Sequence, residues 1–212
     1  MSLHLDAPVI YLITSGEATP SNFDQTSRQI LDIVRVAVDE KVSLVQLREK
    51  RLPVRLVFEL AVKLAEITLG TSTRLLVNDR ADIAVAAKAD GVHRTAASLP
   101  PRVIRGSFRD DLIIGVSTHT LEAAIAAAET GADFAVFAPV FATPGKGEPR
   151  GLEKLAEICR ELRPFPVLGL GGIDETNYHV VIEAGASGFA AIRFLYDPRK
   201  LRAAARDLRK SN

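Results

Sequence analysis

The chain alternates between two hydrophobic patterns. Short apolar runs rich in β-branched residues, such as residues 8–14, are typical of buried strands. Between them lie longer stretches in which apolar residues recur every third or fourth position, as in residues 25–40, and these predict amphipathic helices. We expect strands at residues 8–14, 43–48, 74–78, 91–93, 112–117, 133–137, 166–170 and 188–192, and helices at residues 25–40, 53–69, 80–88, 100–105, 121–130, 152–162, 175–184 and 198–210.

This order gives about eight strand–helix units whose strands are apolar at nearly every position. Strands buried on both faces are typical of a parallel sheet covered by helices, and eight units favour an α/β fold with a closed (β/α)8 TIM barrel. An open doubly wound sheet is the alternative, but it usually carries a glycine-rich turn after the first strand, and residues 14–17 (Thr-Ser-Gly-Glu) are not such a turn. The length of 212 residues predicts one barrel domain over residues 1–212.

The charged residues nearly cancel, with a formal net charge of +1, so we expect no nucleic-acid or acidic-membrane partner and only a local anion site. The lone Cys159 excludes an intrachain disulfide and fits a reducing compartment. The chain start lacks a targeting pattern, and no segment approaches the roughly 20 apolar residues that span a bilayer. We therefore expect a cytoplasmic protein acting on small molecules, and apolar residues on its outer helices could support a homodimer.

Polar residues gather where the predicted strands end, which is where this fold places its active site. Alternation along the second strand would put Gln46, Arg48 and Lys50 on one face. An amide, a guanidinium and an ammonium together suit a ligand that carries a polar ring and several phosphate oxygens. The other strand ends contribute Asn78 and Asp79, His93, Ser117 and His119, Thr143 and Lys146, Gly171 and Gly172, and Ile192 and Arg193.

Three of these groups suggest particular roles. The glycine pair and the turn at Ile192 follow the seventh and eighth strands, where barrels commonly bind phosphate through backbone N–H groups. Asp79 could cap the helix that follows it, and it could also bind Mg²⁺, which one or two carboxylates hold together with substrate phosphates. His93 and His119 both end predicted strands, so at least one of them is a candidate acid or base near neutral pH.

Six motifs together resemble the thiamine phosphate synthase and thiazole tautomerase (TenI-type) superfamily, over about residues 11–198. The motifs are Gln46–Lys50 (QLREK), Val77–Arg80 (VNDR), Ala89–His93 (ADGVH), Gly115–Thr120 (GVSTHT), Phe141–Lys146 (FATPGK) and Gly169–Ile173 (GLGGI). The resemblance implies an enzyme of thiamine biosynthesis, a transferase that couples hydroxymethylpyrimidine diphosphate to a thiazole phosphate and releases diphosphate with the help of Mg²⁺.

The resemblance also implies a role for each matching residue. Gln46 would contact the pyrimidine, His93 would lie near the ring, and Ser117 would form a hydrogen bond near the reacting centre. Asp79 would bind Mg²⁺. The diphosphate would be held by Arg48, Lys50, Asn78 and Lys146, and the thiazole side and its phosphate by Thr143 and the backbone of Gly171 and Gly172.

Three positions depart from the synthase pattern. Ser98 stands where a second magnesium-binding Asp is usual, five positions after the histidine, and a hydroxyl lacks the charge of a carboxylate. Gly145 replaces the usual Thr before the loop lysine, and Arg193 replaces the usual Ser after strand eight, where it could bind the phosphate or crowd it.

Two alternatives to the synthase remain open on these residues. A tautomerase moves a proton on a thiazole phosphate without metal or diphosphate, and His119 aligns with the catalytic histidine of that group. A non-catalytic regulator that binds thiamine phosphate or its precursors is the third hypothesis. We favour the synthase because the residues that would bind diphosphate are all present.

Overall fold

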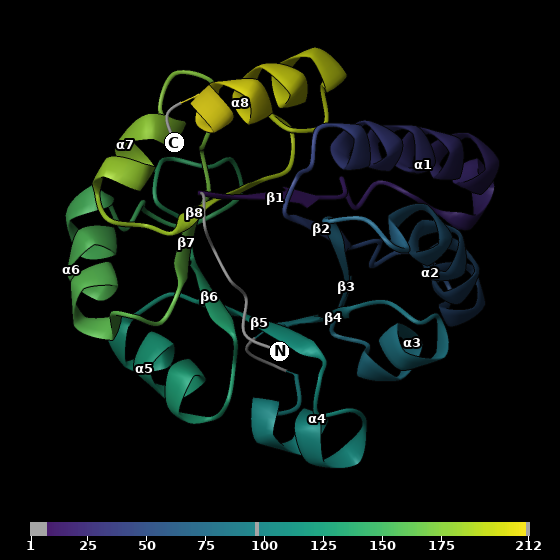
Figure 1. Ribbon diagram of the computed structural model, residues 1–212, viewed down its shortest axis with the longest axis horizontal. Helices are drawn as coiled ribbons and strands as arrows, with labels where there is room; N and C mark the ends of the chain where they lie inside the picture. Colours follow the sequence, from purple (N-terminus) through teal and green to yellow (C-terminus); the bar gives the residue numbers. More distant parts are fainter. Residues whose placement is uncertain (1–7, 96–97, 211–212) are drawn as a thin grey trace.

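The computed structural model describes residues 8–95 and 98–210. Eight parallel strands close into a barrel in sequence order and helices surround it, which confirms the (β/α)8 prediction (Figure 1). The strands are β1 (Val9–Ile13), β2 (Leu44–Leu47), β3 (Arg74–Asn78), β4 (Gly91–Arg94), β5 (Ile113–Thr118), β6 (Phe134–Phe137), β7 (Val167–Leu170) and β8 (Gly188–Ala191). The helices are η1 (Pro20–Asn22, 3-10), α1 (Phe23–Asp39), α2 (Val54–Thr68), α3 (Ala81–Ala86), α4 (Pro101–Ser107), α5 (Leu121–Glu129), α6 (Leu152–Leu162), α7 (Tyr178–Glu183) and α8 (Pro198–Lys210).

The side chains of the barrel strands form two apolar layers. Every second residue, such as Leu44 and Leu76, belongs to a cluster inside the barrel. The residues between them, such as Val45 and Val77, pack in a larger cluster with the helices. Because side chains alternate along a strand, this division fixes which polar residues at the strand ends point into the mouth of the barrel.

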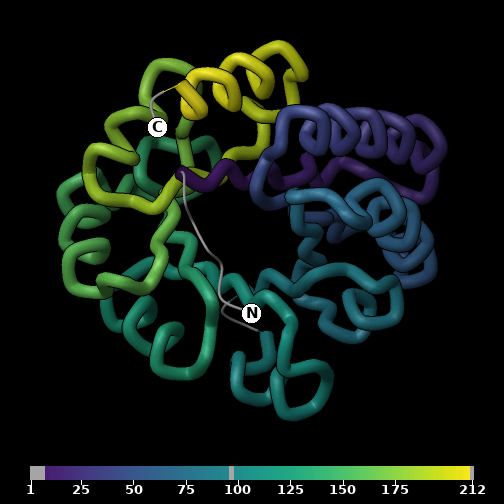
Figure 2. The backbone as a smooth tube through the Cα atoms, in the orientation of Figure 1, coloured from purple at the N-terminus to yellow at the C-terminus, as the bar shows by residue number. Residues whose placement is uncertain are grey.

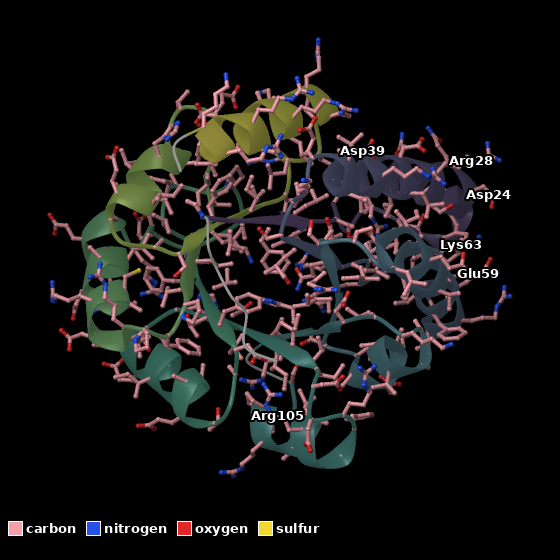
Figure 3. All side chains as sticks on the ribbon, viewed as in Figure 1. Asp24, Arg28, Asp39, Glu59, Lys63 and Arg105 are labelled. Carbon is pink, nitrogen blue, oxygen red and sulfur yellow. The ribbon has the colours of Figure 1, made fainter. Side chains whose placement is uncertain are left out.

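Two aspartates tie neighbouring strands together at their amino ends. Asp90 Oδ2 accepts the N–H of Leu75 at 2.8 Å, and Asp133 Oδ2 accepts the N–H of Ile114 at 2.7 Å. Asp133 also binds Arg105 of α4 at 2.7 Å (Figure 3). Leu75 and Ile114 each lie one residue before the first pair of the β3–β4 and β5–β6 ladders, so the aspartates satisfy N–H groups that those ladders do not. The bonds stabilise the end of the barrel opposite the predicted site.

A carboxylate joins the last helix to the first. The chain runs once round the barrel, so that α8 returns beside α1 (Figure 2). Glu40, directly after α1, lies 7% exposed and accepts hydrogen bonds from Arg202, Arg206 and Arg209 of α8. The bonds from Arg206 and Arg209, with a smaller one from Arg202, lower the pKa of Glu40 to about 2. The carboxylate therefore stays charged and closes the ring of helices.

Two elements differ from the sequence prediction. Strand β2 ends at Leu47, so Lys50 lies in the turn beyond the strand and does not share its alternation. Helix α7 begins at Tyr178, because the side chain of Asp174 accepts the N–H of Thr176 at 2.9 Å and holds a turn ahead of the helix. In the described part of the chain, no helix is both long and apolar enough to cross a bilayer.

Candidate active site

Polar side chains from four neighbouring strands line the carboxyl end of the barrel. Gln46 and Asn78 each lie two residues beyond an apolar side chain of the barrel interior, so both point inward. His93 pairs in register with Asn78 across β3 and β4. Ser117 of β5 reaches the His93 ring. The structure thus brings together four residues that the sequence placed at separate strand ends.

The His93 ring is hydrogen-bonded on both nitrogens. Its Nδ1 lies 3.2 Å from the hydroxyl of Tyr11 on β1, across the barrel interior, and its Nε2 lies 2.9 Å from Oγ of Ser117. Burial lowers the pKa of His93 to about 4; the charge of Asp79 opposes this shift, and the smaller effect of Arg48 adds to it. Burial also raises the pKa of Tyr11 well above its ordinary value. At neutral pH this chain of three side chains is therefore uncharged.

Gly115 makes room for the His93 ring. A Cβ at this position would lie 2.4 Å from Cζ of Phe134 and 2.8 Å from Nδ1 of His93, which is closer than real contacts allow. The Phe134 ring packs edge-on against Tyr11, at 5.7 Å between centroids. A glycine inside strand β5 therefore has a packing reason, which is a common one for glycine in a strand.

Two buried amide atoms in this end of the barrel lack a protein partner. Nε2 of Gln46 and Oδ1 of Asn78 have no hydrogen bond among the described residues. Gln46 is 1% exposed, so water has little access to it. A buried polar atom without a partner costs about 1–3 kcal/mol, and a ligand with a polar edge would recover that energy.

Arg48 is held at the edge of this group by the loop after β1. Its backbone N–H donates to Oγ1 of Thr14 at 2.8 Å. The buried carboxylate of Glu49 accepts the N–H groups of Gly16 at 3.0 Å and Ala18 at 2.9 Å. These bonds attach the loop to the end of β2, and the half-buried guanidinium lies close enough to influence the pKa of His93.

The other predicted cations lie on the exposed outer part of the site. Lys50 follows β2, Lys146 lies in the loop between β6 and α6, and Arg193 follows β8; all three are exposed. The predicted cation set is therefore divided into one guanidinium next to the buried polar group and several charges at the solvent edge.

Asp79 holds the loop between β4 and α4. Its Oδ1 accepts the N–H of Thr95 at 2.7 Å and the hydroxyl of Ser98, and its Oδ2 accepts Nδ2 of Asn78 at 2.8 Å. The Thr95 hydroxyl lies within 3.0 Å of both oxygens. Burial alone would raise the pKa of Asp79, but the hydrogen bonds, above all that from Ser98, lower it. No side chain caps α3, so Asp79 is not a helix cap.

These contacts decide how well the site suits Mg²⁺. A carboxylate offers about four lone-pair directions, and protein donors already use those of Asp79. Ser98, at the position where a second carboxylate would be usual, donates to Asp79 instead. Over residues 8–95 and 98–210, no three His, Cys, Asp or Glu side chains lie close enough to share a metal ion. As placed, the side chains do not fit magnesium.

The glycine pair after β7 has the geometry of an anion-binding turn. Gly171 and Gly172 both have positive φ, 102° and 65°. Neither N–H has a hydrogen-bond partner among the described residues. A Cβ on Gly171 would lie 2.8 Å from Cα of Pro139 and 3.2 Å from Oγ1 of Thr143, so the glycine also permits close packing against the loop between β6 and α6. Successive bare N–H groups in such turns bind phosphate and other anions.

His119 lies at the same end of the barrel but outside the buried group. Its ring is exposed, and its Nδ1 lies 2.7 Å from the carbonyl oxygen of Ala138. Because a carbonyl can only accept, Nδ1 carries a proton in this contact and Nε2 is left to face solvent or a ligand. No contact joins His119 to His93 or Ser117 among the described residues, so the two predicted histidines serve different parts of the site.

Sequence reasoning missed Tyr11, Gly115 and Thr95. Tyr11 lies in an apolar run and Gly115 inside a strand, and the sequence gives neither of them a role in the site. Tyr11 reaches His93 across the barrel interior, and Gly115 is the partner of His93 in the neighbouring strand, so no pattern along one strand indicates either contact. Thr95 follows His93 by two residues, and only the fold of its loop brings it to Asp79.

Comparisons with known proteins identify the family of the chain. A family model described as thiamine monophosphate synthase matches residues 10–195. A putative thiamine-phosphate synthase of Geobacter sulfurreducens is 42% identical over 197 residues, covering 90% of this chain and 89% of that one. A thiamine-phosphate synthase of Moorella thermoacetica is 40% identical over 186 residues, covering 86% and 88%. A thiamine phosphate pyrophosphorylase structure from Pyrococcus furiosus superposes with a TM-score of 0.81 at 30% identity, covering 97% and 96%.

Proposed function

Because the chain belongs to the thiamine monophosphate synthase family, we propose that it is a thiamine-phosphate synthase, a transferase of thiamine biosynthesis. The substrates would be hydroxymethylpyrimidine diphosphate and a thiazole phosphate. The ring nitrogen of the thiazole would displace diphosphate from the pyrimidine methylene carbon, so that one C–N bond forms and one C–O bond breaks.

The observation that carries this proposal is the pair of unpartnered amide atoms beside the His93 and Ser117 pair. Gln46 Nε2 and Asn78 Oδ1 are buried without partners, as expected for groups that await the polar edge of a ring. An aminopyrimidine presents both donors and acceptors along its edge, and an amide can match either. The uncharged His93 ring fits a site for an uncharged heterocycle better than an imidazolium would.

The cations would stabilise the leaving diphosphate. Negative charge grows on the bridging oxygen as the C–O bond breaks, and preorganised positive groups stabilise that charge most in the transition state. The Thr14 and Glu49 bonds fix the backbone at Arg48, and its planar guanidinium would bind two phosphate oxygens at once. Lys50 and Lys146, which are exposed, would close on the diphosphate from the solvent side.

The thiazole phosphate would bind on the opposite side of the barrel mouth. The bare N–H groups of Gly171 and Gly172 supply directional donors there, and Thr143 lies beside Gly171. Arg193 after β8 would add a positive charge next to the same phosphate. This arrangement would hold the two substrates with their reacting atoms between His93 and the loop after β6.

Mass spectrometry of the purified protein with both substrates tests the proposal, in parallel reactions containing Mg²⁺ or EDTA. Thiamine phosphate is the expected product. Product that persists in EDTA would agree with the protein donors that fill Asp79. Product that requires Mg²⁺ would show that the carboxylate exchanges those donors for metal. No product, under conditions in which an authentic synthase works, would overturn the proposal and direct the assay to the tautomerase substrate.

Variants of two lysines provide a matched comparison. Lys146→Ala removes a proposed diphosphate contact and should lower kcat/KM by about tenfold or more, since a charged hydrogen bond contributes roughly 1.5–3 kcal/mol. Lys63→Ala removes a lysine that points outward from α2 and pairs with Glu59 at 3.5 Å (Figure 3). It should leave kcat/KM unchanged. Equal activity of the two variants would exclude Lys146 from the site.

A further inference from the structure

The hydrogen bonds that join Tyr11, His93 and Ser117 inside the barrel have a defined direction of donation. Tyr11 is fully buried, and among the described residues its hydroxyl has one partner, Nδ1 of His93 at 3.2 Å. If Nδ1 carried the proton, the Tyr11 O–H would be a buried donor without an acceptor, a state that folded proteins largely avoid. The Tyr11 hydroxyl therefore donates and Nδ1 accepts.

The direction then passes through the ring to Ser117. A neutral imidazole carries one proton, so with Nδ1 accepting, the proton lies on Nε2. Nε2–H donates to Oγ of Ser117 across 2.9 Å. The serine oxygen thus accepts from within the barrel, and its own O–H is left to point toward the mouth. Burial, which keeps the His93 ring neutral and the phenol protonated, is consistent with this order.

We propose that Tyr11 is a positioning residue for catalysis: it fixes His93 in the Nε2–H tautomer and thereby makes Ser117 a hydrogen-bond donor to the substrate. This inference rests on the proposed synthase function. A donor chain of three groups polarises its last member, so the Ser117 hydroxyl binds a substrate oxygen more strongly as negative charge develops there. Ser117 in this role is not a nucleophile, since no side chain among the described residues is hydrogen-bonded so as to accept its proton.

The packing round the ring maintains this chain. A Cβ at position 115 would lie 2.8 Å from Nδ1 of His93, so only glycine leaves room for the hydrogen bond between Tyr11 and His93. Phe134 packs against both Tyr11 and the His93 ring, at centroid distances of 5.7 and 6.1 Å. This packing holds the Tyr11 and His93 rings in the positions that their hydrogen bond requires.

Two-bond ¹⁵N–¹H correlation spectra of the ligand-free protein test the tautomer, with the His93 signals assigned from a His93→Gln sample. The wild type should show a protonated Nε2 and an unprotonated Nδ1. Tyr11→Phe keeps the ring and removes only the hydroxyl, so Ser117 becomes free to donate and protonated Nδ1 should appear. Ser117→Ala should keep the wild-type tautomer, because the Tyr11 donor remains.

Kinetics then test the consequence for catalysis. Tyr11→Phe should lower kcat by about tenfold, the effect of one lost hydrogen bond in the transition state, with KM changed by less than about twofold. Tyr178→Phe is the matched control, because it removes a tyrosine hydroxyl bound to Asp207 at 2.7 Å on the outer helices. It should leave both the His93 spectrum and kcat unchanged.

Protonated Nδ1 in the wild type would overturn the proposal, as would a Tyr11→Phe variant that is folded by circular dichroism yet has an unaltered spectrum and kcat. A tautomer change in Ser117→Ala would show that Ser117, not Tyr11, sets the state of the ring and would also overturn it. The spectra require no substrate. A protein with the expected tautomer that forms no thiamine phosphate would therefore refute the proposed function separately.

Discussion

Acidification from pH 7 to pH 5 should destabilise the protein through His93. The folded-state pKa of His93 is lowered by burial to about 4, whereas an unfolded histidine titrates near 6.5. A lowered pKa contributes stability that is present above the unfolded value and is lost as the pH falls toward the folded value. Over this window each pH unit costs about 1.4 kcal/mol, so roughly 2 kcal/mol should be lost between pH 7 and pH 5.

Urea unfolding at pH 7 and pH 5 measures this loss, with His93→Gln as the reference. Other titrating groups are common to both proteins, so their contributions cancel in the difference. The free energy of unfolding of the wild type should fall by about 2 kcal/mol more than that of the variant. A difference below about 0.5 kcal/mol would mean that the ring is not held neutral in the folded state, and the hydrogen-bond direction inferred from it would be refuted as well.

Two further substitutions test the packing and the helix junction. Gly115→Ala should destabilise the protein by about 1–3 kcal/mol in urea unfolding and lower kcat, because its Cβ would press on Phe134 and the His93 ring. Gly106→Ala, in α4 with nothing within 4 Å of its Cβ, should be neutral or stabilising; equal losses in both variants would contradict the contact argument. Glu40→Gln should cost about 1–3 kcal/mol at pH 7, since it removes a carboxylate held by arginines. That cost should persist down to about pH 4.5 and disappear toward the folded-state pKa of about 2; a cost independent of pH would indicate that the charge of Glu40 is unimportant.

The fold was predictable because its signal is local. Apolar runs gave the strands to within about two residues, and the helices of residues 152–162 and 198–210 were placed at their observed ends. The predicted start of α7 was early, since a short turn at Asp174 satisfies the backbone ahead of the helix without changing the hydrophobic pattern. Lys50 was misplaced because β2 ends at Leu47, and alternation stops with the strand.

The site was predictable only in part, since alternation states which face a side chain is on but not what lies opposite. Gln46, Asn78, His93 and Ser117 were found from their positions at strand ends. Tyr11 contacts His93 across 82 residues of sequence and through the interior of the barrel, from β1 to β4. The resemblance implies that Asp79 binds magnesium. In the structure Asp79 instead accepts hydrogen bonds from Thr95 and Ser98, and a single carboxylate at a strand end is compatible with either role, so the sequence does not distinguish them.

The distribution of charge in the site determines how a substrate can enter it. The inner part consists of neutral donors and acceptors, namely the Gln46 and Asn78 amides and the His93 ring, and the exposed charges of Lys50 and Lys146 lie outside it. A molecule with a polar ring and an anionic tail gains from both zones only when the ring enters first. The reverse orientation would bury phosphate charge away from its counter-ions, at a cost far larger than any single hydrogen bond returns. If the proposed function is correct, the order of the two zones, more than the identity of any one cation, would select a diphosphate that carries a heterocycle.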